Sequence, residues 1–303
     1  MTDHPGPLVV GTVTDGERQL DLRGPAPFPP DQLFQIGSVT KTFTALLLAR
    51  RMVTGELTYD TPVAELMPIA SALREERPVS VGELATHTSG LPRIPASLWR
   101  RALTFDDNPY QAYGEDRLAG DLARARLRGR GRTRYSNLGM GLLGHALARA
   151  AGTTFDRLVR TEICEPLGLR DTTGEPTGDQ RSRLATGHRR RGRPRDVAWE
   201  FDALAGAGSL WSTGNDVLTY LQAHLAPPEG VLGAALRRVL ADPVLAWQPL
   251  PHGRHRGVWW HNGGTAGFRS MVVLDPARNR AAVALAAIDR GVEAIALGAL
   301  GRD

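Results

Sequence analysis

The chain has 303 residues, of which 42% are hydrophobic and 23% are charged, a composition typical of soluble globular proteins. Its longest apolar runs, Ala45–Ala49 and Ala281–Ile288, are far too short to cross a membrane. The net charge of +5 is spread over a long chain, and such an excess does not by itself indicate nucleic acid binding. A membrane partner and a nucleic acid partner are therefore not expected.

Residues Met1 to Pro7 contain an acid and two prolines, where a secretory signal would need basic and then apolar residues. We therefore expect a cytoplasmic protein. The single cysteine, Cys164, excludes an intrachain disulfide and a cysteine-based metal cluster. It lies in the mostly apolar stretch Ile163–Leu169, which predicts a buried and inert thiol.

The only lysine in the sequence is Lys41, whereas the other basic residues among the 37 are arginines. Arginine stays protonated in proteins, but a buried lysine readily shifts its pKa and can become a neutral base. The one retained lysine therefore indicates a position where an amine is needed, and not merely a positive charge.

The first strand is expected at Leu8–Thr14, a β-branched apolar run that ends at Asp15-Gly16, a hairpin signal. Arg18–Arg23 alternates and can return as the second strand. After a proline-rich link, Val39–Met52 has the apolar spacing of a helix, with Gly55 as its stop.

The middle of the chain is mainly helical in pattern. Helices are expected at Pro62–Met67, Val81–Thr86, Tyr113–Arg128, Leu138–Ala151, Phe155–Ile163 and Thr213–His224. Strands are expected again at Gly257–His261, Phe268–Leu274 and Arg280–Ile288, with turns at Gly263-Gly264 and Asp275-Pro276 and a last helix at Gly291–Leu300.

Strands at both ends of the chain with helices between them predict the fold class α/β (α+β). One antiparallel sheet, closed by the two termini and flanked by helices, would carry an inserted all-helical lobe. The sheet domain is expected to be discontinuous, over residues 1–60 and 250–303, and the lobe to span 61–249. The two would form a single catalytic unit with the site in the cleft between them.

Two arginine-rich stretches stand out, one from Arg124 to Arg134 and one over Arg181–Arg195. Charge runs of this kind usually form a solvated surface. The alternative is a rim that attracts an anionic substrate, since the first run leads directly into Tyr135.

Ser38 and Lys41 lie three residues apart just after Gly37, at the start of the helix expected over Val39–Met52. This spacing puts both side chains on one face of the first turn. A serine hydroxyl is a poor nucleophile until a base takes its proton, and a neutral lysine one turn away can take it. The alternative is that Ser38 only caps the helix and that Lys41 lies on the surface.

Tyr135 and Asn137 come just before a helix start rich in small residues, Leu138–Gly144. A phenol beside an ammonium group can relay a proton between a nucleophile and a leaving group. The Asn137 amide can donate to a substrate carbonyl or anchor the lysine. A tyrosine before a helix also has ordinary packing roles, so Tyr135 and Asn137 indicate a catalytic site only together with the other motifs.

His261, Gly263 and Gly264 follow the aromatic segment Val258–Trp260. Glycines at a strand edge let a ligand approach the backbone closely. The backbone N–H of Gly264, together with that of Ser38, can form an oxyanion hole.

The order of these three motifs resembles the serine β-lactamase-like superfamily, which contains class C β-lactamases, D-alanyl-D-alanine peptidases and related carboxylesterases. The likeness covers almost the whole chain. It is carried by Phe34–Ala45, Leu84–Leu91, Glu165–Leu169, Ala205–Thr213 and His261–Phe268.

The resemblance implies a sheet flanked by helices with an all-helical lobe, and no cofactor or metal. It implies that Ser38 is the nucleophile, Lys41 the general base, Tyr135 the proton relay and Asn137 the amide anchor. We reject a metal site at His87 and His145 because no carboxylate-rich pattern accompanies them.

His261, Asn262 and Gly263 stand where β-lactamases and peptidases of this family usually carry Lys-Thr-Gly, and Gly264 would supply the oxyanion N–H. The family's lysine and threonine help to hold the substrate carboxylate. A largely neutral histidine and an asparagine amide hold it less strongly. The departure favours a carboxylesterase-type serine hydrolase.

Three other functions stay open. The acyl-enzyme could pass its acyl group to an amine or alcohol, as in a biosynthetic acyltransferase (transesterase or amide synthase). The protein could also be a β-lactamase or D-amino-acid peptidase, or a sensor that is acylated without turnover. The expected substrate is a small-molecule ester, amide or lactam. The tryptophans belong either to the core or to an acyl or acceptor pocket: Trp99, Trp199, Trp211, Trp247, Trp259 and Trp260.

Overall fold

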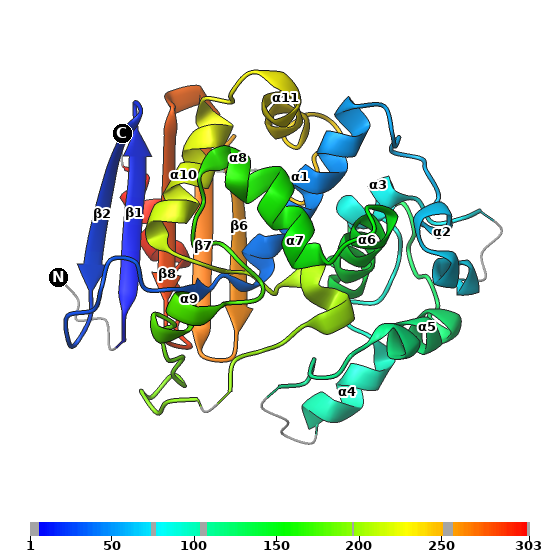
Figure 1. The fold of residues 1–303 in the computed structure, drawn as a ribbon, viewed down its shortest axis with the longest axis horizontal. Coiled ribbons are helices and arrows are strands. Elements are labelled where there is room, and N and C mark those ends of the chain that lie inside the picture. The colour runs from blue at the N-terminus through cyan, green and yellow to red at the C-terminus, as the bar shows by residue number, and fades with distance from the viewer. Residues whose placement is uncertain (1–5, 74–76, 104–107, 196, 251–256, 302–303) are drawn as a thin grey trace.

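A computed structural model of the chain describes residues 6–73, 77–103, 108–195, 197–250 and 257–301. The molecule contains a six-stranded antiparallel sheet with the strand order β2–β1–β8–β7–β6–β5 (Figure 1). Its strands are β1 (Leu8–Thr14), β2 (Glu17–Arg23), β5 (Gln248–Pro249), β6 (Trp259–Thr265), β7 (Phe268–Asp275) and β8 (Arg280–Ala286). Leu8 of β1 lies opposite Ala286 of β8, so segments near the two chain ends close one sheet.

The chain between β1–β2 and β5 is mainly helical. The α-helices are α1 (Thr40–Val53), α2 (Val63–Leu66), α3 (Val81–Ala85), α4 (Ala96–Leu103), α5 (Glu115–Arg124), α6 (Asn137–Ala150), α7 (Phe155–Val159), α8 (Glu165–Leu167), α9 (Gly178–Ser182), α10 (Gly214–Leu225), α11 (Gly230–Arg238) and, after β8, α12 (Glu293–Ala299). Short 3-10 turns lie at Gly37–Val39, Pro68–Ala72, Asp202–Ala207 and Pro276–Arg278, and a π turn at Arg160–Cys164. A second, two-stranded sheet joins β3 (Phe34–Gln35) to β4 (Trp211–Ser212).

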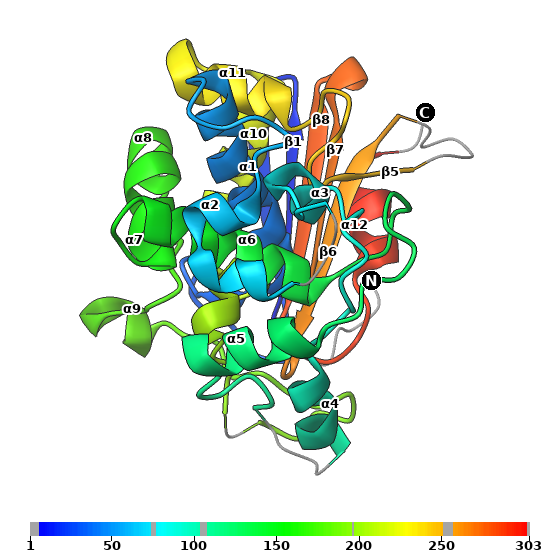
Figure 2. The same ribbon diagram turned by 90° about the vertical axis from the view of Figure 1, so that its right-hand side faces the viewer.

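Helices cover both faces of the large sheet. Figure 2 shows the sheet nearly edge-on, with α12 on one side and α1 and α10 on the other. Because side chains alternate along a strand, Leu8 and Val10 of β1 join the apolar cluster under α12, whereas Val9 and Val13 join the main core. The sheet is therefore the middle layer of the molecule.

Helix α1 is buried along most of its length, from Thr40 to Ala49. It contacts α6, α11 and the 3-10 turn Asp202–Ala207. A helix enclosed in this way is expected to be apolar on all sides. A lysine at its second residue is therefore an exception that needs an explanation.

The fold class predicted from the sequence is confirmed, and the predicted strands and helices lie close to the observed ones. The turn predicted at Gly263-Gly264 is wrong. β6 continues to Thr265 because Gly263 and Gly264 pair with Ser270 and Arg269 of β7, and the chain turns at Gly267, where φ is +78°. Helices α4, α8, α9 and α11 and the two-residue strands β3, β4 and β5 lie outside the predicted elements.

The division into residues 1–60 with 250–303 and a lobe over 61–249 stays a prediction. Helix α10, inside the second range, packs on β1 and β8 of the sheet. Cys164 is buried, as expected, and burial raises the pKa of its thiol. Among the described helices, none has both the length and the apolar character needed to cross a bilayer.

Candidate active site

Ser38 lies in the 3-10 turn Gly37–Val39, which leads directly into α1. The turn is pressed against β6. A Cβ atom at Gly37, where φ is +50°, would lie 2.8 Å from the backbone nitrogen of Gly264, and one at Gly263 would lie 2.1 Å from the carbonyl oxygen of Ile36. Both positions therefore require glycine. The turn that carries Ser38 therefore lies directly against the backbone of Gly263 and Gly264, since a Cβ atom at Gly263 would also lie 2.9 Å from the backbone nitrogen of Ser38.

Lys41 is fully buried, one turn along from Ser38. Its Nζ lies 2.9 Å from Oγ of Ser38 and donates a hydrogen bond to the carbonyl oxygen of Ala207 at 2.6 Å. Burial, and secondly the positive charge of Arg93, hold the pKa of Lys41 well below its ordinary range. No carboxylate in the described part of the chain pairs with this amine. The geometry thus favours a neutral amine in contact with a serine hydroxyl.

Tyr135 completes this cluster from the segment that leads into α6. Its ring centroid lies 4.9 Å from Nζ of Lys41 and 5.2 Å from the guanidinium carbon of Arg93, and its hydroxyl interacts with Ser38. Burial raises the pKa of Tyr135 to about 12, although the Ser38 hydrogen bond and Arg93 oppose the shift. The phenol is therefore protonated at neutral pH and can donate a proton.

Asn137 begins α6, two residues after Tyr135. Its Nδ2 donates to the hydroxyl of Tyr110 at 3.4 Å, and its backbone N–H donates to the carbonyl oxygen of Arg93 at 2.8 Å. Its Oδ1 is buried and has no partner among the described residues. Asn137 is therefore bonded to neighbours other than Lys41, and its free oxygen is left for another group.

His261 on β6 is fully buried, with its ring centroid 6.2 Å from that of Tyr135. Its Nδ1 donates to the carbonyl oxygen of Asn262 at 2.8 Å, because a carbonyl can only accept. Burial, then the charge of Lys41, lowers the pKa of His261 to about 3. The ring is therefore neutral at physiological pH.

Asn262 points its amide toward α12, where Nδ2 donates to Oε1 of Glu293 at 3.0 Å. Beyond this point the outer edge of β6 is open, since in the described residues β5 pairs only with Trp259 and Trp260. Gly264 is exposed on this edge, close to Ser38. An extended ligand can therefore approach the backbone of β6 beside the serine.

A polar cavity of about 520 Å³ adjoins the same end of the sheet. Its lining consists of Arg190, Arg269, Asp289, Arg290 and Gly291. Arg269 lies opposite Gly264 in the β6–β7 register and forms an ion pair with Asp289. The cavity therefore offers guanidinium donors, one of which already has a carboxylate partner.

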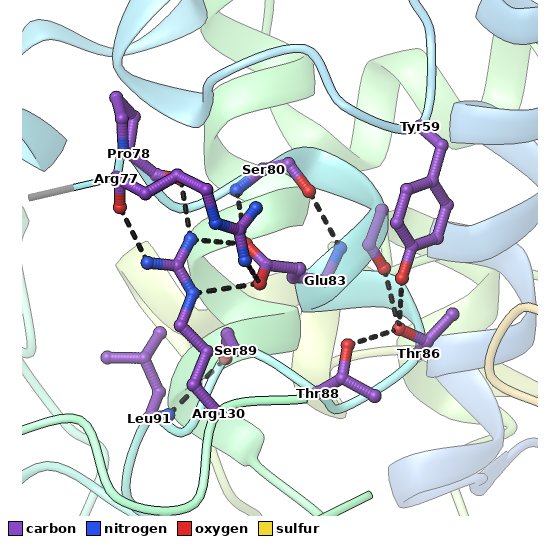
Figure 3. A network of polar contacts seen from close by, with 11 residues as sticks. Tyr59, Arg77, Pro78, Ser80, Glu83, Thr86, Thr88, Ser89, Leu91 and Arg130 are labelled. Carbon is purple, nitrogen blue, oxygen red and sulfur yellow. Dashed lines mark hydrogen bonds and ion pairs between the residues drawn. The ribbon is translucent and has the colours of Figure 1, made fainter. Parts of the chain in front are cut away.

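The first arginine-rich stretch contributes to the framework of the site. Figure 3 shows Arg130 and Arg77 converging on Glu83 of α3, with Nε of Arg130 at 2.8 Å from Oε1 of Glu83. Burial would raise the pKa of Glu83, but its bonds to Arg130, to the Ser80 backbone N–H and to Arg77 lower it. Arg130 is only 17% exposed, so it joins two loops and does not form part of a substrate rim.

The sequence interpretation named Ser38, Lys41, Tyr135, Asn137, His261, Gly263 and Gly264. The structure places Lys41 and Tyr135 beside Ser38, His261 beside Tyr135, and Gly263 and Gly264 against the Ser38 turn, whereas the Asn137 side chain bonds to Tyr110. The sequence interpretation did not assign the carbonyl oxygen of Ala207, Arg93 or His87 to the site. The sequence could have indicated His87, because the residue lies in Leu84–Leu91, one of the segments that carry the family resemblance.

Of the tryptophans, Trp211 and Trp247 are buried and Trp99 is 56% exposed. No group of three metal-binding side chains occurs in the described residues.

Comparison with known proteins gives a consistent result. A profile of the family described as Beta-lactamase matches residues 4–300. The chain is 29% identical over 201 residues to the D-alanyl-D-alanine-carboxypeptidase/endopeptidase AmpH of Escherichia coli (strain K12), covering 65% of this chain and 50% of that protein. It is 27% identical over 276 residues to a Beta-lactamase of Pseudomonas fluorescens, covering 86% of this chain and 68% of the relative. Against AmpH, the chain thus spans about half the length of its relative.

Among solved structures, the class C beta lactamase from Rhodobacter sphaeroides superimposes with a TM-score of 0.80 at 26% identity, covering 98% of this chain and 94% of that one. The beta-lactamase from Sulfitobacter sp. EE-36 gives a TM-score of 0.80 at 25% identity, covering 98% and 91%. The family resemblance noted in the sequence is confirmed.

Proposed function

Because the chain belongs to the Beta-lactamase family, we propose that it is a serine hydrolase of carboxylesterase type that forms an acyl-enzyme on Ser38. The observation that carries the proposal is the pair formed by Ser38 and the buried amine of Lys41, 2.9 Å apart. A buried lysine held below its ordinary pKa is a base, and a serine in contact with it is an activated nucleophile.

In the proposed acylation step, Oγ of Ser38 attacks the ester carbonyl carbon while its proton moves to Nζ of Lys41. The negative charge passes to the carbonyl oxygen, which the backbone N–H groups of Ser38 and Gly264 stabilise. The C–O bond to the leaving group then breaks. The proton held by Lys41 reaches the departing alkoxide through the hydroxyl of Tyr135, so that the alcohol leaves neutral and both side chains return to their starting states.

Deacylation would repeat these transfers with water in place of the alcohol. Water attacks the acyl carbon, its proton passes through Tyr135 and Lys41, and the Ser38 oxygen leaves with a proton from Lys41. The free Oδ1 of Asn137 is suited to accept a hydrogen bond from an N–H or O–H group of the substrate.

Two features of β6 support an ester substrate over one bearing a carboxylate. His261 is neutral and buried, so it offers no positive charge to an anion. The amide of Asn262 donates to the carboxylate of Glu293, which places a negative charge beside the strand. Hydrolysis of β-lactams or D-alanyl peptides is the second candidate, and the activities for which the two relatives are named favour it.

The proposal is tested by intact-protein mass after mixing with a short p-nitrophenyl ester, with Ser38→Ala as the control. A transient acyl adduct absent from the variant, with steady p-nitrophenol release, is the expected result. Release that quickens with an added amine or alcohol would instead identify an acyltransferase, and a lasting adduct would identify a sensor. If wild type and Ser38→Ala behave alike, the assignment of Ser38 fails.

A cephalosporin and a D-alanyl-D-alanine peptide serve as competing substrates in the same assay. The proposal expects kcat/KM for the p-nitrophenyl ester to exceed that for both. A preference for either competitor would contradict the esterase proposal but would leave the acyl-enzyme on Ser38 intact.

A further inference from the structure

His87 lies beside Tyr135 in an unusual backbone conformation. Its φ is +59°, in the left-handed region that residues other than glycine rarely adopt. The loop around it is fixed by backbone hydrogen bonds. The N–H of Arg134 donates to the carbonyl oxygen of His87 at 2.8 Å, and the N–H of Gly131 donates to that of Thr88 at 2.8 Å. The surrounding structure therefore imposes this conformation.

The polar network of Figure 3 joins the loop that carries His87 to the segment that precedes Tyr135. Glu83 precedes His87 by four residues and bonds to Arg130, which lies five residues before Tyr135. The hydroxyl of Thr86 donates to the carbonyl oxygen of Gly82 at 2.9 Å. Thr86 also contacts the hydroxyl of Thr88 at 2.8 Å. The network thus holds the His87 loop against the segment that carries Tyr135.

The imidazole of His87 contacts both Tyr135 and the next peptide group. Its ring centroid lies 4.7 Å from that of Tyr135, with an angle of 40° between the planes. Its Nδ1 accepts the backbone N–H of Ser136 at 3.2 Å. Since an N–H can only donate, Nδ1 is unprotonated and the hydrogen of the neutral ring is on Nε2. The ring therefore restrains Tyr135 from the side and through its backbone.

An ordinary core residue would not combine these features. His87 is 5% exposed, and its Nε2 is buried without a partner among the described residues. A buried donor left unpaired destabilises the folded state, and an apolar side chain would avoid this cost. Burial, then the charges of Lys41 and His261, lowers the pKa of His87 to about 3, so the ring adds no positive charge beside Lys41. Strain and unpaired polar groups of this kind cluster at functional sites.

We propose that His87 is a positioning residue for acyl transfer, holding Tyr135 through ring contact and the Ser136 N–H so that the phenol hydroxyl stays on Ser38. The inference rests on the proposed acyl-enzyme chemistry. His87 itself does not touch the reacting atoms.

Two substitutions of His87 test the role of its hydrogen bond to the Ser136 N–H. His87→Leu keeps much of the volume but removes the acceptor for the Ser136 N–H. His87→Asn offers an acceptor oxygen near the position of Nδ1, and asparagine tolerates left-handed backbone well. His224→Leu is the matched control, because His224 is also buried with an unpartnered Nε2 but lies against Tyr220 and Trp247.

Misplacement of a group by about 1 Å can slow a reaction by about 100-fold, so we expect His87→Leu to reduce kcat about 30-fold. KM for a p-nitrophenyl ester should change by less than about threefold, and His87→Asn should recover most of kcat. In a Tyr135→Phe background, His87→Leu should have almost no further effect, because residues that act through one another are non-additive.

Equal losses in the wild-type and Tyr135→Phe backgrounds would overturn the inference, as would an equal loss in His224→Leu. A readout that does not need activity keeps this result separate from the proposed function. In protein labelled with ¹³C-tyrosine, the resonance that disappears in Tyr135→Phe should broaden or split in His87→Leu, where the ring is no longer held in one position, and stay a single sharp signal in His87→Asn. If wild type gives no adduct on Ser38 but the resonance responds in this way, the proposed function fails while the contact with Tyr135 stands. A single sharp resonance in His87→Leu would contradict the positioning role.

Discussion

The start of α1 and strand β6 lie side by side, because the turn Gly37–Val39 packs on β6, yet the two regions differ in what their polar groups are bonded to. At α1, Lys41 is fully buried, contacts Ser38 and has no carboxylate partner in the described residues. On β6, His261 is neutral and the Asn262 amide is bonded to Glu293. The first region retains the groups that the proposed acyl transfer needs. The second differs from the family's carboxylate-binding pattern. Under the proposed function, reaction type and substrate choice thus depend on separate parts of the fold.

The largest effect is expected from Lys41→Arg, which keeps a positive charge but removes the base. Arginine does not lose its proton in proteins, so acylation of Ser38 should fall by about 1000-fold or more. The rate of p-nitrophenol release measures this, with Ser38→Ala defining the background. Circular dichroism of the variant verifies its fold, and Lys41→Met provides a second substitution of similar length. Activity of Lys41→Arg close to wild type would remove Lys41 as the base.

Tyr135→Phe removes the proton relay and leaves the ring. Loss of a general acid–base group typically slows the reaction by about 100-fold or more, and we expect about 100-fold here. Both acylation and deacylation should slow, because each needs the phenol hydroxyl. Burst and steady-state phases of p-nitrophenol release report the two steps separately. A wild-type rate in both phases would exclude Tyr135 from the mechanism.

The pH dependence follows from the lowered pKa of Lys41. The lysine is a base only when neutral, so kcat/KM should rise about tenfold per pH unit while Lys41 is protonated and then level off. Because the pKa is lowered, the plateau should begin well below the ordinary lysine range. Tyr135, with a pKa of about 12, stays protonated throughout and should cause no fall at moderately alkaline pH. An inflection near the ordinary lysine value of about 10.4 would contradict the account.

The smallest effect is expected at the β6 edge, from Glu293→Gln. Removing this charge should raise kcat/KM for a carboxylate-bearing ester about fivefold, which corresponds to about 1 kcal/mol for a partly exposed charge. The neutral ester with the same leaving group should change by less than about twofold. Glu17→Gln on β2, at the opposite edge of the sheet, is the matched control. Equal changes for both esters would show that Glu293 does not discriminate by charge.

The sequence predicted the part of the site that is local. Ser38 and Lys41 are three residues apart on one helical turn, so their contact follows from helix geometry. Tyr135 lies almost a hundred residues away, and only the family resemblance linked it to Ser38. The antiparallel sheet followed from the strand patterns at the two chain ends.

Other features could not be predicted because they depend on distant backbone. The carbonyl oxygen of Ala207 accepts from Lys41 across 166 residues, and a backbone acceptor leaves no mark in the side-chain pattern. Gly263 and Gly264 suggested a turn, whereas the structure uses them for the close approach of the Ser38 loop. Helix α11 was overlooked even though Leu232 and Leu236, four residues apart, are both buried in it.

The central claim is that Lys41 is a neutral base beside Ser38, and the chain permits a direct measurement. Because Lys41 is the only lysine, protein grown with ¹³Cε-lysine gives a single lysine signal whose chemical shift follows protonation. The account predicts that this signal titrates well below the ordinary lysine pKa of about 10.4, and that the lowered value persists in Ser38→Ala because burial is its main cause. Titration at the ordinary value would show that the amine is charged at neutral pH, and would contradict its role as the base.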